Sequence, residues 1–239
     1  MLFRVISCLV VLAAVFVRPC LAEVPHNTLT PGEKATGWRL LFDGKTLDGW
    51  GATGEKDIWR VVDGELVNDA PRSEHGPRGY LYTKERFGNF SLYMEFKITP
   101  AANSGLVFRW DNLDDPIYSG IELQIYDSYK DLGTSMEHMS NHHCGSVYDI
   151  AAPRYNVYKP AGEWNTLSLT CRDNLVWVTM NGKRIVFVNL DRWTTPGKNP
   201  DGSENKFPTA YKDMPREGHI GLQDYRGVIS VRNFKIQPL

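Results

Sequence analysis

Cysteine, basic runs and long apolar segments are all scarce in this sequence. Only four of its 239 residues are cysteine, and two of those fall within the first 20. The other two, Cys144 and Cys171, are interpreted as free thiols, with Cys171 buried as a small apolar residue. Beyond residue 22 no segment approaches the roughly 20 consecutive apolar residues of a membrane-spanning helix. The 27 Lys and Arg residues are balanced by 28 Asp and Glu, and without a basic run we expect no nucleic-acid partner.

Several catalytic and metal-binding signatures are missing as well. The sequence has no glycine-rich phosphate loop and suggests no Ser-His-Asp arrangement. His138, His142 and His143 lie in one loop, but their spacing matches no zinc signature. Segment 111–115 carries oxygen ligands suited to calcium without the ordered spacing of a calcium loop. We therefore predict no cofactor, and leave a divalent ion such as calcium open.

The first 22 residues have the pattern of a secretory signal peptide. Arg4 precedes an apolar run, Val5–Val17, and the stretch closes with a small-x-small cleavage site at Cys20–Ala22. We therefore expect the mature chain, residues 23–239, to form a single domain that is secreted or periplasmic.

Nearly all the remaining sequence reads as short strands separated by turns. The sequence clearly predicts the start of a single helix. Thr30 is the N-cap residue, Pro31 follows it in the first turn, and Glu33 lies three residues after the cap. Antiparallel strands with almost no helix predict an all-β sandwich of two packed sheets. The expected strands are Trp38–Phe42, Ile58–Val62, Glu65–Val67, Tyr80–Lys84, Phe90–Ile98, Ser104–Trp110, Gly120–Asp127, Trp164–Cys171, Leu175–Met180, Arg184–Leu190, His219–Gln223 and Val228–Ile236.

Turn residues indicate how several of these strands are joined. Asp63-Gly64 and Asn181-Gly182 are strong hairpin signals. A turn near Arg226-Gly227 predicts that the last two strands pair with each other. Two long loops, 128–145 and 193–217, are expected either to rim a binding face or to be mobile.

Polar side chains alternate with apolar ones along three neighbouring strands in the middle of the chain. Glu95 lies on the polar face of the first strand, Arg109 on that of the second, and Glu122 and Gln124 on that of the third. Because strand side chains alternate with a period of two, these four groups meet on one face if the three strands share a sheet. That face is the candidate site.

Seven motifs in order along the chain resemble the 3-keto-disaccharide hydrolase family. They cover nearly all of the sequence after residue 36, and although each is weak alone, the ordered set is specific. The motifs are Gly37–Trp50 (GWRLLFDGKTLDGW), Trp59–Leu66 (WRVVDGEL), Asn103–Arg109 (NSGLVFR), Gly120–Asp127 (GIELQIYD), Gly162–Asn165 (GEWN), Asn181-Gly182 and Gly221–Asp224 (GLQD).

The resemblance implies a concanavalin-like jelly roll and action on glycosides whose sugar is oxidised at C3. It also implies export by bacteria that degrade glycans, with a carbohydrate as the partner. One departure matters, because members often carry a histidine directly after the Leu-Gln-Asp motif and this chain has Tyr225 there. Any task of that histidine must have moved or been lost.

A ketone at C3 acidifies the hydrogen on C2, so the bond at C1 can break by elimination, and hydration follows. Such a route needs a base, a group that stabilises the enolate, and an acid at the leaving oxygen. We expect Glu122 and Asp127 to act as base and acid, and Arg109 to stabilise the enolate. The expected substrate-binding residues are Glu95, Gln124, Tyr93, Tyr148, Gln223 and Asp224.

Two other functions remain open on the sequence alone. The spacing Glu122-x-Gln124-x-x-Asp127 is similar to the Glu-x-Asp-x-x-Glu pattern of laminarinase-like endoglucanases, which need two carboxyl groups about 5 Å apart. A non-catalytic carbohydrate-binding module is the other alternative. Arg109 also has a purely structural interpretation, as the ion-pair partner of Glu95 or Glu122. The oligomeric state is left open.

Overall fold

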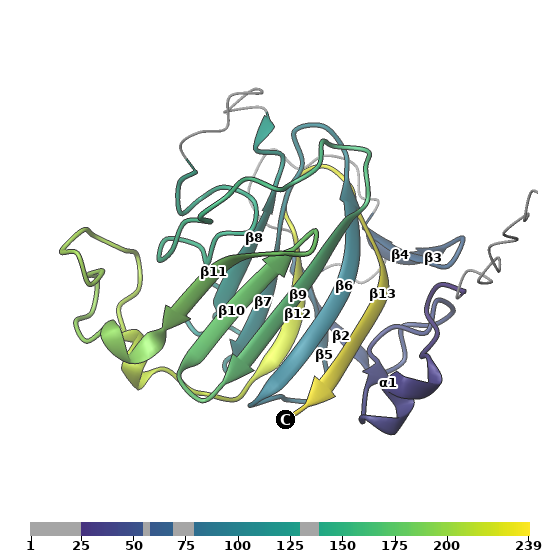
Figure 1. Ribbon diagram of the computed structural model, residues 1–239, viewed down its shortest axis with the longest axis horizontal. Coiled ribbons are helices and arrows are strands. Elements are labelled where there is room, and N and C mark those ends of the chain that lie inside the picture. The colour runs from purple at the N-terminus through teal and green to yellow at the C-terminus, as the bar shows by residue number, and fades with distance from the viewer. Residues whose placement is uncertain (1–24, 55–57, 69–78, 130–138) are drawn as a thin grey trace, which may run out of the picture.

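The computed structural model describes residues 25–54, 58–68, 79–129 and 139–239, and Figure 1 shows two antiparallel β-sheets packed face to face. The elements are α1 (Pro31–Ala35), β1 (Arg39–Leu40), β2 (Trp50–Gly54), β3 (Trp59–Val62), β4 (Glu65–Asn68), β5 (Gly79–Thr83), β6 (Phe90–Ile98), β7 (Asn103–Trp110), β8 (Ile121–Tyr126), β9 (Asn165–Arg172), β10 (Leu175–Met180), β11 (Lys183–Asn189), the short 3₁₀ helices η2 (Leu190–Arg192) and η3 (Tyr211–Asp213), β12 (His219–Asp224) and β13 (Ile229–Pro238).

One sheet, called sheet A here, has the strand order β11-β10-β9-β6-β13-β4-β3, and β1 also pairs with β13. The other, sheet B, has the order β2-β5-β12-β7-β8. All strand pairs described for the two sheets are antiparallel. The predicted all-β sandwich of two antiparallel sheets is therefore confirmed.

The core lies between the two sheets and is built from alternate residues of each strand. In β6 every second side chain, from Phe90 to Ile98, is buried, while those between are partly exposed. Leu106 and Phe108 from β7 and Leu123 and Ile125 from β8 meet them from the other sheet. Burying a side chain of this size stabilises the fold by about 1.5–3 kcal/mol, so the period-two pattern fixes which face of each strand turns inward.

Local signals in the sequence are confirmed where they specify local geometry. The Thr30 side chain accepts from the Glu33 backbone N–H and the Glu33 carboxylate accepts from the Thr30 backbone N–H, which completes the capping box of α1. Asp63 and Gly64 have φ of 50° and 78°, and Asn181 and Gly182 have φ of 48° and 78°. Positive φ at both central residues is the requirement of the tight hairpin turn predicted at each place.

The condition for a common face, that the three middle strands share one sheet, is not met. β6 belongs to sheet A, whereas β7 and β8 belong to sheet B. The connection through residues 99–102 crosses from one sheet to the other instead of making a hairpin. A period of two gives the face of a strand but not its neighbour, so the pattern alone could not exclude this crossing.

The predicted pairing of the last two strands is wrong for the same reason, since β12 lies in sheet B and β13 in sheet A. Residues 225–228 cross between the sheets alongside the first crossing. Asn103 and Arg226 exchange two backbone hydrogen bonds of 2.8 and 3.0 Å, and the Thr99 backbone N–H donates to Val228 O at 3.0 Å. An added Cβ on Gly227 would come within 2.7 Å of Ala102, so this contact between the crossings requires glycine.

Some expectations fall outside the described residues, namely the signal peptide and His138. Cys144 and Cys171 are both free, as interpreted, and Cys171 is buried. Cys144 lies in a turn, as expected for a loop thiol, and its side chain packs into the core. None of the helices in the described segments is long and apolar enough to cross a membrane.

Candidate functional site

A cleft of about 200 Å³ opens on the outer face of sheet B, away from the core. Strands β5, β7, β8 and β12, which lie together in Figure 1, form its floor, and residues from four loops form its walls. The lining residues are Tyr80, Asn103, Ile117, Glu122, Gln124, Tyr148, Lys206, Gln223 and Tyr225.

Glu122 is the carboxylate of this cleft, and a glycine in the neighbouring strand leaves room for its side chain. Its side chain extends across Gly105 of β7, where an added Cβ would stand 2.2 Å from Glu122 Oε1. The side chain is half-buried, and burial raises its pKa to about 7, an effect that the positive charge of Lys206 partly opposes. A carboxyl group that gains and loses its proton near neutral pH is suited to general acid–base catalysis.

Tyr148 reaches the cleft because segment 146–148 adds to the edge of β8. The Tyr148 backbone N–H donates to Glu122 O at 2.9 Å, and the Gln124 backbone N–H donates to Ser146 O at 2.9 Å. Burial, and then the nearby charge of Glu122, raises the pKa of the Tyr148 phenol. The hydroxyl therefore stays protonated at neutral pH and is available as a hydrogen-bond donor beside Glu122.

Polar groups from three strands complete the floor. Gln223 Nε2 donates to the Tyr80 hydroxyl at 2.9 Å, and burial raises the pKa of Tyr80 to about 12. The buried Gln124 Oε1 has no hydrogen-bond partner among the described residues. Leaving such an acceptor unpaired is costly, and a hydroxyl-bearing ligand would remove that cost.

Lys206 supplies positive charge from the loop between η2 and η3. Its backbone N–H donates to Asp149 Oδ2 at 2.6 Å, and Asn199 Nδ2 donates to the Asp149 carbonyl oxygen at 3.3 Å, so the loop is anchored to the wall that carries Tyr148. Lys206 Nζ lies 4.3 Å from the Tyr148 ring centroid. Among the described residues no carboxylate oxygen lies within 4.0 Å of Nζ.

Four of the predicted site residues come together in this cleft: Glu122, Gln124, Tyr148 and Gln223. The other five lie elsewhere. Glu95 and Tyr93 are on the outer face of sheet A, because β6 belongs to that sheet. There the Glu95 carboxylate accepts from Arg232 Nε at 2.7 Å, from Asn233 Nδ2 at 2.8 Å and from the Tyr93 hydroxyl at 3.2 Å. The expectation that Glu95 shares a face with Glu122 is therefore wrong.

Arg109 is turned away from the cleft by a β-bulge. Its φ is 51°. Val107 pairs with Gly221 of β12 and Trp110 pairs with His219, so β7 has one residue more than β12 between these two pairs. The extra residue reverses the alternation. Arg109 is fully buried at the end of the sandwich, where Nη1 donates to Asp173 O at 2.7 Å and Nε donates to Gly88 O at 3.3 Å. The expected enolate role is therefore wrong. The structural alternative named Glu95 or Glu122 as the partner, whereas the partners are backbone carbonyl oxygens.

The same bulge places Trp110 on the outer face instead of in the main core. Trp110 packs with Tyr80 and Val107 in a separate buried cluster beneath the cleft, and its ring centroid lies 5.1 Å from that of Tyr80. Gly221 lets the indole lie against β12, since an added Cβ would be 3.1 Å from it. The indole therefore supports the ring that bears one of the site hydroxyls.

Asp127 and Asp224 point inward and hold the fold together. Asp127 Oδ2 accepts from the Ala101 backbone N–H at 2.8 Å, which fixes the first crossing between sheets, where Ala101 has φ of 59°. Asp224 Oδ1 accepts from Asn68 Nδ2 at 2.8 Å, and this bond joins sheet B to β4 of sheet A. The expectation that these two carboxylates face the substrate is wrong.

Five lining residues were not predicted from the sequence: Tyr80, Asn103, Ile117, Lys206 and Tyr225. A partial signal existed for Lys206, since one expectation for the loop 193–217 was that it rims a binding face. Tyr225 follows Asp224 directly and lines the cleft at the position where the resemblance led us to look for a histidine.

The described residues contain no group of three or more His, Cys, Asp or Glu side chains that could hold a metal ion. His142 Nε2 lies 3.1 Å from Asp149 Oδ1, and its ring centroid lies 4.7 Å from that of Tyr148. His143 Nδ1 accepts from the Ser140 backbone N–H at 2.8 Å. Both described histidines of this loop thus support the wall of the cleft.

The chain is similar to proteins that act on oxidised sugars. A family model described as the 3-keto-alpha-glucoside-1,2-lyase-like domain matches residues 37–237. A 3-keto-disaccharide hydrolase of Bacteroides thetaiotaomicron is 26% identical over 230 residues, which cover 86% of this chain and 79% of that protein.

Two solved structures from Parabacteroides distasonis, whose description as glycosyl hydrolases is itself provisional, have the same fold. The first is 30% identical with a TM-score of 0.72 and covers 84% of this chain and 99% of that one. The second is 26% identical with a TM-score of 0.71 and covers 90% of this chain and 100% of that one.

Proposed function

Because the chain belongs to the 3-keto-alpha-glucoside-1,2-lyase-like family, we propose that it cleaves the glycosidic bond of 3-keto-glycosides in the cleft that contains Glu122. The observation that carries the proposal is a half-buried carboxyl group with a pKa near 7 that lines a cleft beside a lysine and two protonated phenols.

In the proposed reaction the Glu122 carboxylate removes the proton from C2 of the sugar. The electron pair of that C–H bond forms an enolate with the C3 ketone, and the enolate then expels the aglycone from C1 as a double bond forms between C1 and C2. Water adds to C1 and a proton returns to C2, which gives the free 3-keto sugar and the released alcohol. A base with a pKa near the working pH is the most effective for the first step.

We assign Lys206 to the developing enolate oxygen, because an ammonium group in a cleft stabilises negative charge that appears only during the reaction. We assign the Tyr148 hydroxyl to the leaving oxygen as the proton donor. Gln124, Gln223 and Tyr80 would bind the sugar hydroxyl groups. The unpaired Gln124 Oε1 supports this assignment.

The test is turnover of a synthetic 3-keto-glucoside by the wild type and by Glu122→Gln. We expect the variant to lose at least a hundredfold in kcat while its KM changes by less than fivefold, because the amide keeps the shape of the side chain but cannot accept a proton. Glu163→Gln is the matched control, since Glu163 is exposed and lies outside the cleft. Equal turnover by the wild type and Glu122→Gln would refute the assignment of the base.

The two alternatives give different results in the same assay. A laminarinase-like endoglucanase needs two carboxyl groups about 5 Å apart, and Glu122 is the one carboxylate among the described lining residues while Asp127 is bonded to Ala101. Such an enzyme would release reducing ends from unoxidised β-glucan. A non-catalytic module would bind sugar and release nothing from either substrate.

We also propose that the protein is exported, on the basis of the signal-peptide pattern in residues 1–22. Expression of the full chain in a bacterium with a periplasm should yield a mature protein whose N-terminal sequence begins at Glu23.

A further inference from the structure

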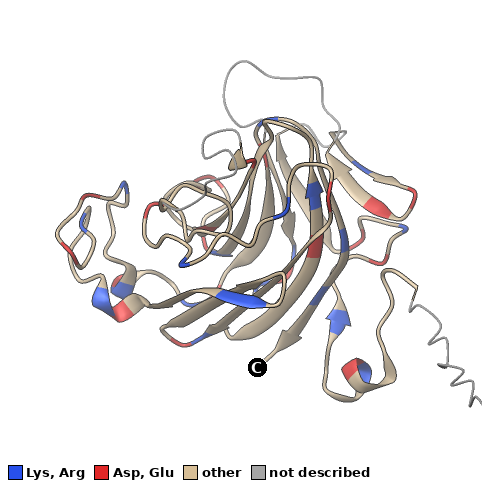
Figure 2. Ribbon diagram, turned by 45° about the horizontal axis from the view of Figure 1, so that its top comes forward, with Lys and Arg blue, Asp and Glu red and all other residues tan. Residues whose placement is uncertain are grey.

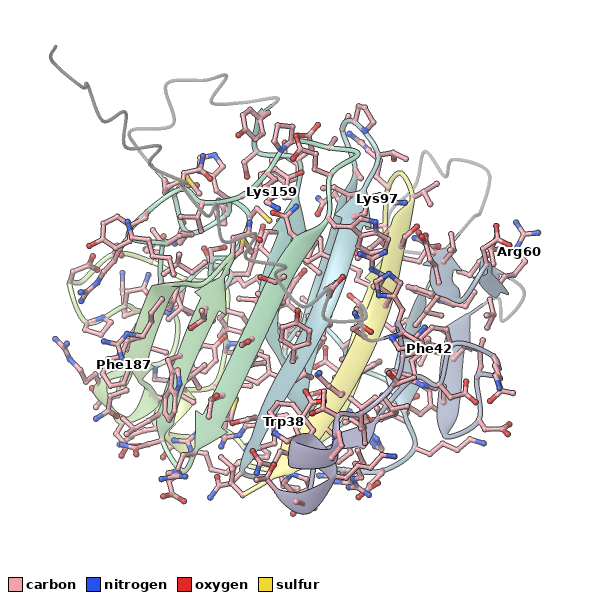
Figure 3. All side chains as sticks on the ribbon, turned by 45° about the vertical axis from the view of Figure 1, so that its right-hand side comes forward. Trp38, Phe42, Arg60, Lys97, Lys159 and Phe187 are labelled. Atoms are coloured by element: carbon pink, nitrogen blue, oxygen red, sulfur yellow. The ribbon has the colours of Figure 1, made fainter. Side chains whose placement is uncertain are left out.

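A second and larger recess lies along the edge of sheet A that β11 forms. It has a volume of about 440 Å³ and follows the edge strand β11. Figure 3 shows Phe187 on this edge of the molecule. The recess, called the β11 groove here, is lined by Arg154, Tyr155, Lys183, Arg184, Ile185, Val186 and Phe187.

The charged side chains of the β11 groove are all basic. Arg154, Lys183 and Arg184 line it, and Figure 2 shows basic residues at the start of this edge strand. No carboxylate among the described residues lies within 4.0 Å of any of the three, whereas Arg232 and Arg216 elsewhere have carboxylate partners at 2.7 and 3.1 Å. The chain as a whole has a formal net charge of −1. The groove is therefore a local concentration of unpaired positive charge on a protein that is otherwise balanced.

The groove also exposes two aromatic rings. Tyr155 is 48% exposed and Phe187 is 49% exposed. Both belong to the small set of large apolar side chains that are exposed among the described residues. Lys183 Nζ lies 3.5 Å from the Tyr155 ring centroid. Phe187 lies beside Trp177, at 6.5 Å between ring centroids, so its ring extends an apolar platform next to the cations.

The floor of the groove is held by backbone contacts. The Arg154 backbone N–H donates to Ile185 O at 2.8 Å, so residue 154 continues the hydrogen bonding of the sheet edge. Beneath it, Gly145 approaches Ile185 so closely that an added Cβ would lie 2.5 Å from Cδ1. The cations are therefore presented from a packed edge and not from a free loop.

A single segment connects this groove to the cleft. Tyr148 lines the cleft and Tyr155 lines the groove. Seven residues of extended chain span at most about 25 Å, so the two sites lie within that distance along the backbone. One polymeric ligand of several sugar units is long enough to bridge them.

We propose that the β11 groove binds a segment of an acidic glycan, with Arg154, Lys183 and Arg184 at its carboxylate or sulfate groups and Phe187 against the apolar face of a sugar ring. A guanidinium group forms two charge-assisted hydrogen bonds with a carboxylate or a tetrahedral oxyanion, and a neutral glycan offers no charged acceptor. We name a glycan and not a nucleic acid because the chain belongs to a family whose model is named for action on a glucoside. The proposal concerns binding outside the cleft, so it stands or falls separately from the cleavage of 3-keto-glycosides.

The experiment measures binding of the purified protein to polygalacturonate, dextran sulfate and neutral dextran by isothermal titration calorimetry at low and moderate salt. The two acidic polymers separate carboxylate from sulfate as the bound group. We expect at least one of them to bind, at least tenfold more tightly than dextran, and the affinity to fall as salt rises. The double variant Lys183→Gln/Arg184→Gln should weaken that binding at least tenfold, and Phe187→Ala at least threefold.

The control is Lys34→Gln/Lys45→Gln, which removes the same charge from exposed side chains outside the groove. It should bind the acidic polymer as the wild type does. Circular dichroism and turnover of a 3-keto-glucoside should be unchanged in every groove variant, which shows that the fold is intact. The proposal is overturned if dextran binds equally well, if neither acidic polymer binds, if both double variants lose affinity to the same extent, or if single-stranded DNA of equal charge binds more tightly than either acidic glycan.

Discussion

The Glu122 carboxylate lies across Gly105 of the neighbouring strand, with no room between them for a methyl group. An added Cβ at residue 105 would stand 2.2 Å from Oε1 and 2.9 Å from Cγ of Glu122. Gly105 does not have a positive φ, so its backbone is open to other residues. The glycine therefore leaves room for the side chain of its neighbour, and a larger residue at 105 would make the Glu122 carboxylate shift.

The substitution Gly105→Ala tests this relationship. The alanine methyl would push the Glu122 side chain away from the sheet, and overpacking of this kind costs about 1–3 kcal/mol. We expect kcat on a 3-keto-glucoside to fall at least tenfold while the protein remains folded. Gly32→Ala is the control, because an added Cβ there meets nothing within 4 Å. Unchanged kcat in Gly105→Ala would show that the added methyl group does not displace the Glu122 carboxylate from its working position.

The raised pKa of Glu122 predicts a specific dependence of stability on pH. The folded state holds the proton up to about pH 7, whereas the unfolded chain loses it near the ordinary value of 4.5. The folded state thus binds more protons between these values, and Glu122 makes stability decrease as pH rises through that window. We expect Glu122→Gln to be about 1–3 kcal/mol more stable than the wild type at pH 8 and close to it at pH 4.

Urea unfolding of both proteins at the two pH values measures this difference. A stability gain of the variant that is the same at pH 4 as at pH 8 would mean that burial does not raise the pKa of this group.

Lys206 should lower the pH at which activity rises on the acidic side of the pH profile. Its positive charge lowers the pKa of Glu122 against the larger effect of burial. Lys206→Gln removes that charge, so we expect the pH at which kcat/KM reaches half its maximum to move upward, and kcat itself to fall at least tenfold through loss of the enolate partner. The measurement is the pH profile of kcat/KM for both proteins. Lys212→Gln, an exposed position in η3 directly after the loop that carries Lys206, should leave the profile in place.

Asp127 and Glu95 should be dispensable for catalysis although both were predicted site residues. Asp127→Ala frees the Ala101 backbone N–H, and we expect a loss of about 1–3 kcal/mol in the free energy of unfolding with kcat within twofold of the wild type. Glu95→Gln weakens the pairing with Arg232 on the other sheet and should also keep kcat. Thermal unfolding and turnover at 25 °C measure the two effects separately, and a hundredfold loss of kcat in either folded variant would contradict this placement.

The sequence alone was sufficient wherever a feature depends on near neighbours in the chain. The capping box at Thr30 and the turns at Asp63-Gly64 and Asn181-Gly182 are specified by dihedral angles and hydrogen bonds within a few residues, and all three formed as predicted. The pairing of Glu122 and Gln124 on one outward face likewise follows from the alternation along β8.

Which side chains share the site was decided by tertiary structure. The crossing at residues 99–102 sends Glu95 to the opposite sheet, and the bulge at Arg109 reverses that side chain and Trp110. The bulge depends on Gly218, where an added Cβ would come within 2.3 Å of the Arg109 backbone, a contact between residues more than 100 positions apart. Alternation along a strand determines its faces, but its neighbours and its register depend on contacts between distant segments. The sequence alone therefore could not show that Lys206, Tyr148 and Tyr80 come together around Glu122.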